Sequence, residues 1–100
     1  MGDKYSKVIS IAEKRNPELL RDFLHPDFMY VSEFGLLMVE EFIADIRKNI
    51  ETGWTLVRPK CLYENEISLV WEHVSDGVLV THVQLWKDGK LWREMVNRNV

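Results

Sequence analysis

The chain has 100 residues, of which 46% are hydrophobic and 29% are charged, and its formal net charge is −3. This length supplies one hydrophobic core, so the sequence predicts a single domain over residues 1–100. Acidic and basic residues are interspersed without the basic stripe that phosphate binding needs, which argues against nucleic acid as a partner. Because no apolar run reaches the ~20 residues of a membrane span, we expect a cytoplasmic protein that does not bind membranes.

The first part of the chain has the spacing of two amphipathic helices. Apolar residues recur along one face of residues 4–15, which predicts a helix. Asn16-Pro17 ends this helix and begins another, because Asn caps a helix and Pro fits its first turn. His25-Pro26 stops the second helix.

A strand and a longer helix follow. Residues 28–32 predict a short strand, and Gly35 allows the chain to reverse after it. Residues 39–50 space their apolar side chains as an amphipathic helix does, and Gly53 ends it. We expect this helix to pack on a sheet.

From Trp54 onward the pattern changes to strands. Four are predicted, over residues 54–63, 66–75, 78–87 and 90–99. Asp76-Gly77 and Asp88-Gly89 separate the last three strands, and Asp-Gly is a strong signal for a two-residue hairpin turn. Pro59 lacks a donor for the strand ladder, which indicates an edge strand or a bulge. Helices followed by an antiparallel meander predict the α+β class.

The hairpin turns predict which side chains share a face of the sheet. Two-residue turns place Trp71 opposite His82 and Gln84 opposite Arg93, with Met95 beside His82. One face then gathers Trp71, His73, His82, Gln84, Arg93 and Asn97. A three-residue turn at the first hairpin would slip the pairs by one residue and bring Glu72 beside His82. We favour the two-residue turn.

The opposite face is more apolar and carries Val70, Thr81, Val83, Leu85, Trp92 and Val96. Large apolar groups on both faces are expected when neither face is left to water. One face should therefore line a pocket under the helices, and the other should meet a partner. The alternative is that the apolar stripe forms the domain's own core and the polar face lies outside.

Four short motifs occur in order along the chain: Leu24-His25-Pro26-Asp27-Phe28, Gly35, Glu40-Glu41-Phe42-Ile43 and Trp86-Lys87-Asp88-Gly89-Lys90-Leu91-Trp92-Arg93. Together with the helix order, they give nearly the whole chain a resemblance to the nuclear transport factor 2-like superfamily. It is most similar to the small bacterial branches of unknown function and to polyketide-cyclase-like members. The resemblance implies a cone, in which a bent sheet wraps around the helices and encloses a pocket.

The same resemblance implies a homodimer, because superfamily members commonly pair through the outer sheet face. Here that face would carry Val83, Leu85, Trp92 and Val96. The fold hosts isomerases, dehydratases, epoxide hydrolases, binders and interaction modules, so it does not fix the chemistry.

Ketosteroid isomerase has this fold, and its chemistry needs a carboxylate base and an oxyanion hole. Matching the last hairpin puts His82 at the position of the oxyanion-hole acid. Matching the first strand puts Ser32 at the position of the base. Because Ser32 is not a carboxylate and Glu33 alternates to the other strand face, steroid-type isomerisation is disfavoured.

His82 is the catalytic candidate, since an imidazole can act as a general acid or base or orient a ligand. His73 and His82 could approach each other, but no spaced Cys or carboxylate cluster completes a metal site, so we expect no metal and no cofactor. Cys61, the single cysteine, is expected to be a small buried hydrophobe. The predicted ligand-binding residues are Tyr30, Trp54, Trp71, His73, His82, Gln84, Arg93, Met95 and Asn97.

Three functions remain open on the sequence. The first is a pocket protein that binds a small, largely apolar molecule. The second is an enzyme of the isomerase, cyclase or hydrolase kind that uses His82 as acid or base. The third is a homodimeric interaction module without a ligand. The first is our prediction, although the short chain leaves little material for loops that close a site, which favours the third.

Overall fold

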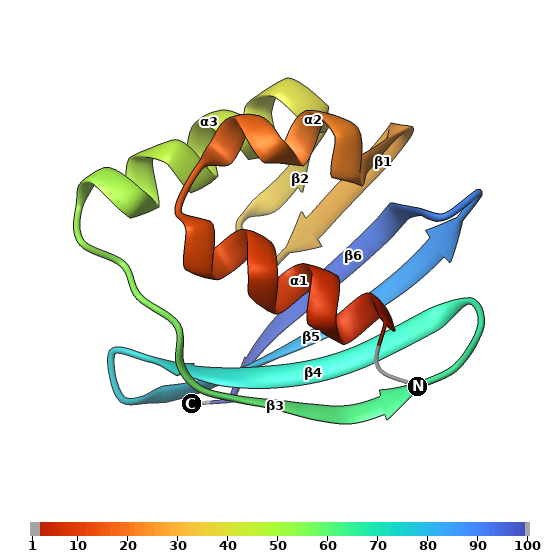
Figure 1. Cartoon of the computed structure of the whole chain (residues 1–100). Helices are drawn as coiled ribbons and strands as arrows, with labels where there is room; N and C mark the ends of the chain where they lie inside the picture. Colours follow the sequence, from red (N-terminus) through yellow and green to blue (C-terminus); the bar gives the residue numbers. More distant parts are fainter. Residues whose placement is uncertain (1–2, 100) are drawn as a thin grey trace.

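Helices lie on one side of a bent sheet in the computed structural model, which describes residues 3–99 (Figure 1). The helices are α1 (Asp3–Lys14), the 3-10 helix η1 (Pro17–Leu19), α2 (Leu20–Phe23) and α3 (Val39–Glu51). The strands are β1 (Leu24–Ser32), β2 (Gly35–Leu37), β3 (Val57–Glu64), β4 (Ser68–Ser75), β5 (Val78–Lys87) and β6 (Lys90–Asn99). The predicted order of helices and strands is confirmed except for β2, where only a turn at Gly35 was predicted, and the α+β cone is confirmed with it.

Three strands begin at other residues than predicted, and the smallest change is in β4, which starts at Ser68 instead of residue 66. β1 already starts at Leu24, which pairs with Leu91, and the pairing is then interrupted until Met29. Pro26 lies inside this interruption, where its missing N–H costs no ladder bond. β3 starts only at Val57, because Trp54 belongs to the segment that descends from α3.

The six strands follow the order β2-β1-β6-β5-β4-β3. The predicted antiparallel meander is present from β3 to β6, but β1 joins β6 in parallel, so the whole sheet is mixed rather than antiparallel. β3 is an edge strand with a register shift between Val57 and Lys60, which confirms the interpretation of Pro59. Figure 1 shows the sheet curving around α1, with α2 and α3 above it.

The hydrophobic core lies between the helices and the concave face of the sheet. Phe28 and Leu69 are fully buried, and Ile43 of α3 and Leu91 of β6 are nearly so. Cys61 is half-buried opposite Trp71 and packs against this core, as a small apolar residue does.

Within residues 3–99, no helix has both the length and the apolar character needed to cross a membrane.

Both Asp-Gly steps form two-residue turns. Asp76 and Gly77 have φ of 51° and 78°, and Asp88 and Gly89 have φ of 54° and 74°. Positive φ at both central positions is the signature of the type I′ hairpin turn. The predicted pairing of Trp71 with His82 is confirmed, and the three-residue alternative is wrong.

The predicted register of the second hairpin is wrong beyond its first residues. Trp86 pairs with Leu91, but Leu85 pairs with Arg93, so Trp92 is an extra residue in a β-bulge. The bulge moves every later partner by one position. Glu94, not Arg93, lies opposite Gln84.

The bulge also decides which β6 side chains reach the concave face. Those of Glu94, Val96 and Arg98 do, and they line cavities beside α3. Arg93 and Met95 lie on the convex face with Leu85 and Val83, their partners on β5. Glu94 therefore takes the concave position that plain alternation gives to Arg93, and Arg93 lies on the convex face.

Candidate functional site

A chain of hydrogen-bonded side chains crosses the concave face of β4, β5 and β6. Gln84 Nε2 donates to Glu94 Oε1 at 2.9 Å, and Glu94 Oε2 lies 2.6 Å from His82 Nδ1. His82 Nε2 in turn lies 2.9 Å from His73 Nε2. Trp86 closes the other end, donating from Nε1 to Gln84 Oε1 at 3.2 Å. We call Gln84, Glu94, His82 and His73 the polar network.

Three of the four members of the polar network are almost completely removed from water, and the side chain of the fourth, His82, is 12% exposed. Gln84 is 2% exposed, and Glu94 and His73 are each 4% exposed. Burying a carboxylate is costly unless it is paired and hydrogen-bonded. Both oxygens of Glu94 have a partner, one in Gln84 and one in His82, and this pairing makes the buried charge tolerable.

Aromatic side chains fix the orientation of both imidazoles. Trp71 stacks on the ring of His82 with 4.2 Å between centroids and 8° between planes. Trp54 meets His73 edge-on at 5.9 Å. Arg15 holds the segment that carries Trp54, donating to the carbonyls of Trp54 and Ile50. The imidazoles are therefore held in place by stacking as well as by hydrogen bonds.

Burial and neighbouring charge set the protonation of two groups in the site. Desolvation, with the neighbouring His82 second, lowers the pKa of His73 to about 4, so His73 is neutral at pH 7. Burial, followed by the negative charges of Glu94 and Asp45, raises the pKa of Tyr30. The Tyr30 hydroxyl therefore stays protonated and is a hydrogen-bond donor at neutral pH.

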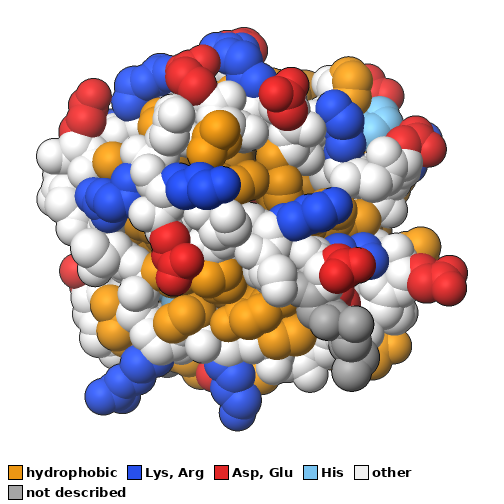
Figure 2. Space-filling model, in the orientation of Figure 1, with side chains coloured by type: hydrophobic (Ala, Val, Ile, Leu, Met, Phe, Trp, Pro, Cys, Tyr) orange, Lys and Arg blue, Asp and Glu red, His pale blue; other side chains and the backbone are white. Residues whose placement is uncertain are grey.

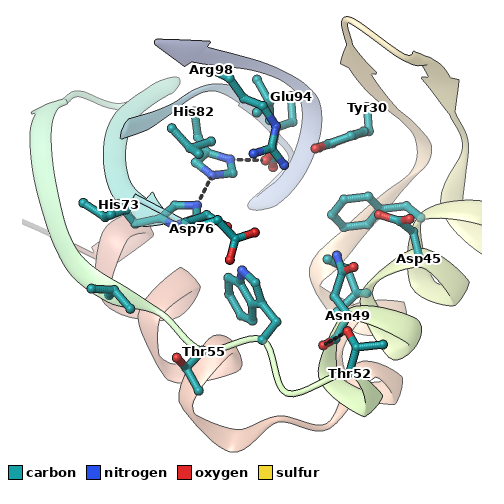
Figure 3. Close-up of a pocket in the computed structure, with 18 of the residues that line it drawn as sticks. Tyr30, Asp45, Asn49, Thr52, Thr55, His73, Asp76, His82, Glu94 and Arg98 are labelled. Atoms are coloured by element: carbon teal, nitrogen blue, oxygen red, sulfur yellow. Dashed lines mark hydrogen bonds and ion pairs between the residues drawn. The ribbon is translucent and has the colours of Figure 1, made fainter. Parts of the chain in front are cut away.

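A cavity of about 440 Å³, the outer cavity, lies between the polar network and the C-terminal half of α3. Figure 3 shows His73, His82, Glu94 and Tyr30 on the sheet side. Asp45, Asn49 and Thr52 face them from α3 and its end, and Asp76 and Arg98 flank the space. The wall therefore mixes aromatic surface with charges of both signs.

A second space of about 120 Å³, the inner chamber, lies between the helices and the sheet. It is lined mainly by apolar side chains of α1, α2 and α3. Trp54, His73, His82 and Glu94 line both spaces, so the polar network forms part of the wall of each.

Six of the predicted ligand-binding residues come together around these two spaces. They are Tyr30, Trp54, Trp71, His73, His82 and Gln84. The approach of His73 to His82 is thus confirmed as a direct contact. Among residues 3–99, no group of three or more His, Cys, Asp or Glu side chains is placed to hold a metal ion.

The other three predicted residues lie outside the cavities because of the bulge. Arg93 donates from Nη1 to the Asp27 carbonyl at 2.6 Å, with its guanidinium 4.0 Å from the centre of the Trp92 ring. Met95 is 55% exposed. Asn97 bonds to Asn99 at 3.0 Å.

The bulge also changes which residues form the apolar face that the sequence predicts. Val96 lines the outer cavity, while Met95 takes its place beside Val83. The convex apolar stripe is therefore made of Val83, Leu85, Trp92 and Met95, and the homodimer stays a prediction.

Sequence reasoning missed Glu94, Asp45, Asn49 and Arg98 as lining residues. Asp45 and Asn49 are four residues apart on α3, a spacing that puts both on one helix face. Ser32, the position matched to a carboxylate base, accepts the Phe34 N–H through Oγ at 3.2 Å inside the β1–β2 turn. The Ser32 hydroxyl therefore already accepts a hydrogen bond within its own turn.

Neither a protein-family model nor a curated protein matches the chain. Solved structures do match it. A protein from Sphaerobacter thermophilus gives a TM-score of 0.75 at 11% identity, over 98% of this chain and 94% of its own. An NTF2-like protein of unknown function from Cytophaga hutchinsonii gives 0.65 at 14% identity, over 91% and 82%.

A steroid delta-isomerase from Pseudomonas aeruginosa gives a TM-score of 0.66 at 11% identity, over 96% of this chain and 77% of its own. At identities this low, the matches show a similar backbone fold and do not show a similar site. The mixed sheet that curves around three α-helices, together with these matches, shows that the chain has the nuclear transport factor 2-like fold.

Proposed function

We propose that the chain binds a small, largely apolar molecule in the cone and holds its polar end against His82 and His73. The polar network carries this proposal. Replacing buried charged groups by a hydrophobic core of the same volume often leaves a protein equally or more stable, so stability alone does not account for a buried carboxylate and two imidazoles. His73, His82 and Glu94 instead line a cavity of about 440 Å³, and a few polar groups in an otherwise aromatic wall are what orients a ligand in a binding pocket.

Proton transfer is the second candidate, favoured by the Glu94–His82 contact. A carboxylate that accepts from Nδ1 of an imidazole orients the ring and stabilises its protonated form, which is the arrangement of acid–base catalysts. The proton at the His82–His73 contact could then be passed along the network. A steroid delta-isomerase has the same fold, which supports an isomerase-type reaction. The absence of a carboxylate at Ser32 argues against that reaction.

A ligand that binds only the folded state will raise the melting temperature. At a ligand concentration of 100 times Kd the stabilisation is about 2.7 kcal/mol, which is on the order of 10–20 °C for a domain of this size. We expect one chemical series in a library of small apolar and weakly polar molecules to stabilise the wild type in a thermal-shift screen. His82→Asn should lose this response.

Thr81→Val is the matched control, because Thr81 is the neighbour of His82 on the opposite face of β5. It should keep the response to the ligand. A library without any stabilising compound, or equal shifts in His82→Asn and wild type, would count against the proposal. For each compound that binds, deuterium uptake from D2O at its carbon atoms separates proton transfer from binding alone.

The convex face supports a proposal on assembly. Leu85 is 40% exposed and Met95 is 55% exposed, and both lie on neighbouring strands beside Val83. We propose that a second copy of the chain covers this stripe. Met95→Lys places a charge at its centre, and we expect sedimentation velocity to change from dimer to monomer. A control substitution at exposed Glu66 should leave the dimer intact, and a wild type that sediments as a monomer would contradict the proposal.

A further inference from the structure

The wall of the inner chamber differs in chemistry from that of the outer cavity. The chamber lies beneath the hydrophobic side chains that Figure 2 shows between α1 and α2 on the helical face. Val8, Ile11 and Ala12 of α1 line one side of it, and Leu20 and Phe23 line another. None of these side chains carries a polar atom, so this part of the wall presents hydrocarbon only.

The polar residues on the sheet side of the chamber do not offer a hydrogen bond to an occupant. Both oxygens of Glu94, both ring nitrogens of His82 and both polar atoms of Gln84 already have partners. Nε1 of Trp71 and Nδ1 of His73 have no partner among the described residues, but they are buried beneath other atoms, so an occupant does not reach them. The sheet side therefore presents almost no polar surface to the chamber.

A wall of this kind favours hydrocarbon over polar groups. A hydroxyl, amide or charged group that enters the chamber gives up its hydrogen bonds to water and gains none in return. A hydrocarbon group is favoured there because its apolar surface leaves water. The volume of about 120 Å³ is a little below that of an apolar cavity, roughly 150 Å³, that binds benzene. The chamber therefore accommodates one six-membered ring or a branched chain of similar size.

The polar end of the same ligand has a place in the outer cavity. Tyr30, Asp45, Asn49 and Arg98 line that cavity and not the inner chamber, and Figure 3 shows them around its open space. Trp54 lines both spaces, so one molecule can extend past it from one space to the other. Recognition of apolar and polar groups is therefore divided between two adjoining spaces.

We infer that the inner chamber is a subsite for an unsubstituted hydrocarbon group of about six or seven carbon atoms. The inference rests on the proposed binding function and names the class of ligand, which is an amphiphile with one bulky hydrocarbon end and one polar end. The hydrocarbon end packs among the side chains of α1 and α2. The polar end stays in the outer cavity beside His82.

Two molecules of equal size test the requirement for hydrocarbon. p-Cresol has a methyl group opposite its hydroxyl, so it can enter the chamber with the methyl group first. Hydroquinone has the same number of heavy atoms but a hydroxyl at each end, so one hydroxyl must enter. In NMR titrations that follow the methyl signals of the protein, we expect a Kd on the order of 0.1–1 mM for p-cresol and about tenfold weaker binding for hydroquinone.

The orientation of bound p-cresol distinguishes the chamber from any other apolar surface. In a nuclear Overhauser experiment, the methyl group of p-cresol should contact the methyl groups of Ile11 and Leu20. The ring protons beside its hydroxyl should contact Trp54 instead. The δ-methyl signal of Ile11 is assigned by its loss in Ile11→Val.

Ala12→Leu fills the chamber and should abolish p-cresol binding. Ala12→Met blocks the same space with a more adaptable side chain and takes its place if Ala12→Leu does not fold. Ala44→Leu makes the matched change at an exposed position of α3 and should leave binding intact. The melting temperature of each variant shows that it is folded.

Three results would overturn the inference: equal binding of p-cresol and hydroquinone, a bound p-cresol whose methyl group does not contact Ile11 or Leu20, or binding that survives in the folded Ala12 variants. Failure of the inference is distinguishable from failure of the proposed function. Library compounds that lose their effect in His82→Asn but keep it in Ala12→Leu would sustain the outer cavity as the site and remove the inner chamber from it.

Discussion

Replacing Glu94 by alanine should lower the free energy of unfolding by about 3–5 kcal/mol, which is the usual cost of removing one partner from a buried charged pair. The loss leaves the Nδ1 of His82 and the amide of Gln84 without their acceptors, and both side chains have little exposure to water. Glu94→Gln keeps the shape and should cost less, about 1–3 kcal/mol. Urea unfolding at pH 7 measures both values.

Glu66→Ala is the control for this experiment, because Glu66 is exposed in the turn between β3 and β4. It should change the stability by less than about 0.5 kcal/mol. If Glu94→Ala cost no more than Glu66→Ala, Glu94 would not be the buried centre of the polar network. The same variant should also lose the ligand response of the wild type, because His82 loses the group that orients it.

Acid should destabilise the domain through His73. Its pKa is about 4 in the folded state against an ordinary value of 6.5, so between these values the unfolded chain binds more protons. The free energy of unfolding therefore rises as the pH increases between these two values, and it decreases as the pH falls between them. The contribution from this one residue is roughly 3 kcal/mol between pH 7 and pH 4.

His73→Asn removes the titrating group, and its stability should fall less than that of the wild type over the same range. Val80→Ala is the matched control, because it removes buried volume from the neighbouring strand without removing a proton site. It should lower the stability by a similar amount at both pH values. Parallel pH profiles of His73→Asn and wild type would contradict the low pKa of His73.

Local sequence chemistry was sufficient to predict half of the site. The Asp76-Gly77 pair favours a two-residue turn, which sets the register of β4 against β5, and alternation along the strands then puts Trp71, His73, His82 and Gln84 on one face. These residues are close in the chain and are joined by one short turn, so no distant contact was needed to place them.

The other half depends on contacts between distant segments. Nothing in the local sequence around Trp92 signals a bulge. The bulge lies where β6 also pairs with the distant strand β1, through Leu91 on one side of Trp92 and Arg93 on the other. Asp45 and Asn49 share a helix face, but only the packing of α3 on the sheet turns that face toward the cavity. Tertiary packing of this kind is invisible to turn signals and periodicity.

The extra residue in β6 also predicts how this chain tolerates deletions. Removing Trp92 would leave a plain ladder in which Leu85 still pairs with Arg93 and Gln84 with Glu94. Removing Met95 instead would reverse the alternation of all later residues, so that Asn97 would turn inward in place of Val96. Two deletions only three positions apart would thus have opposite outcomes, because one keeps the residues of the cavity wall and the other replaces them.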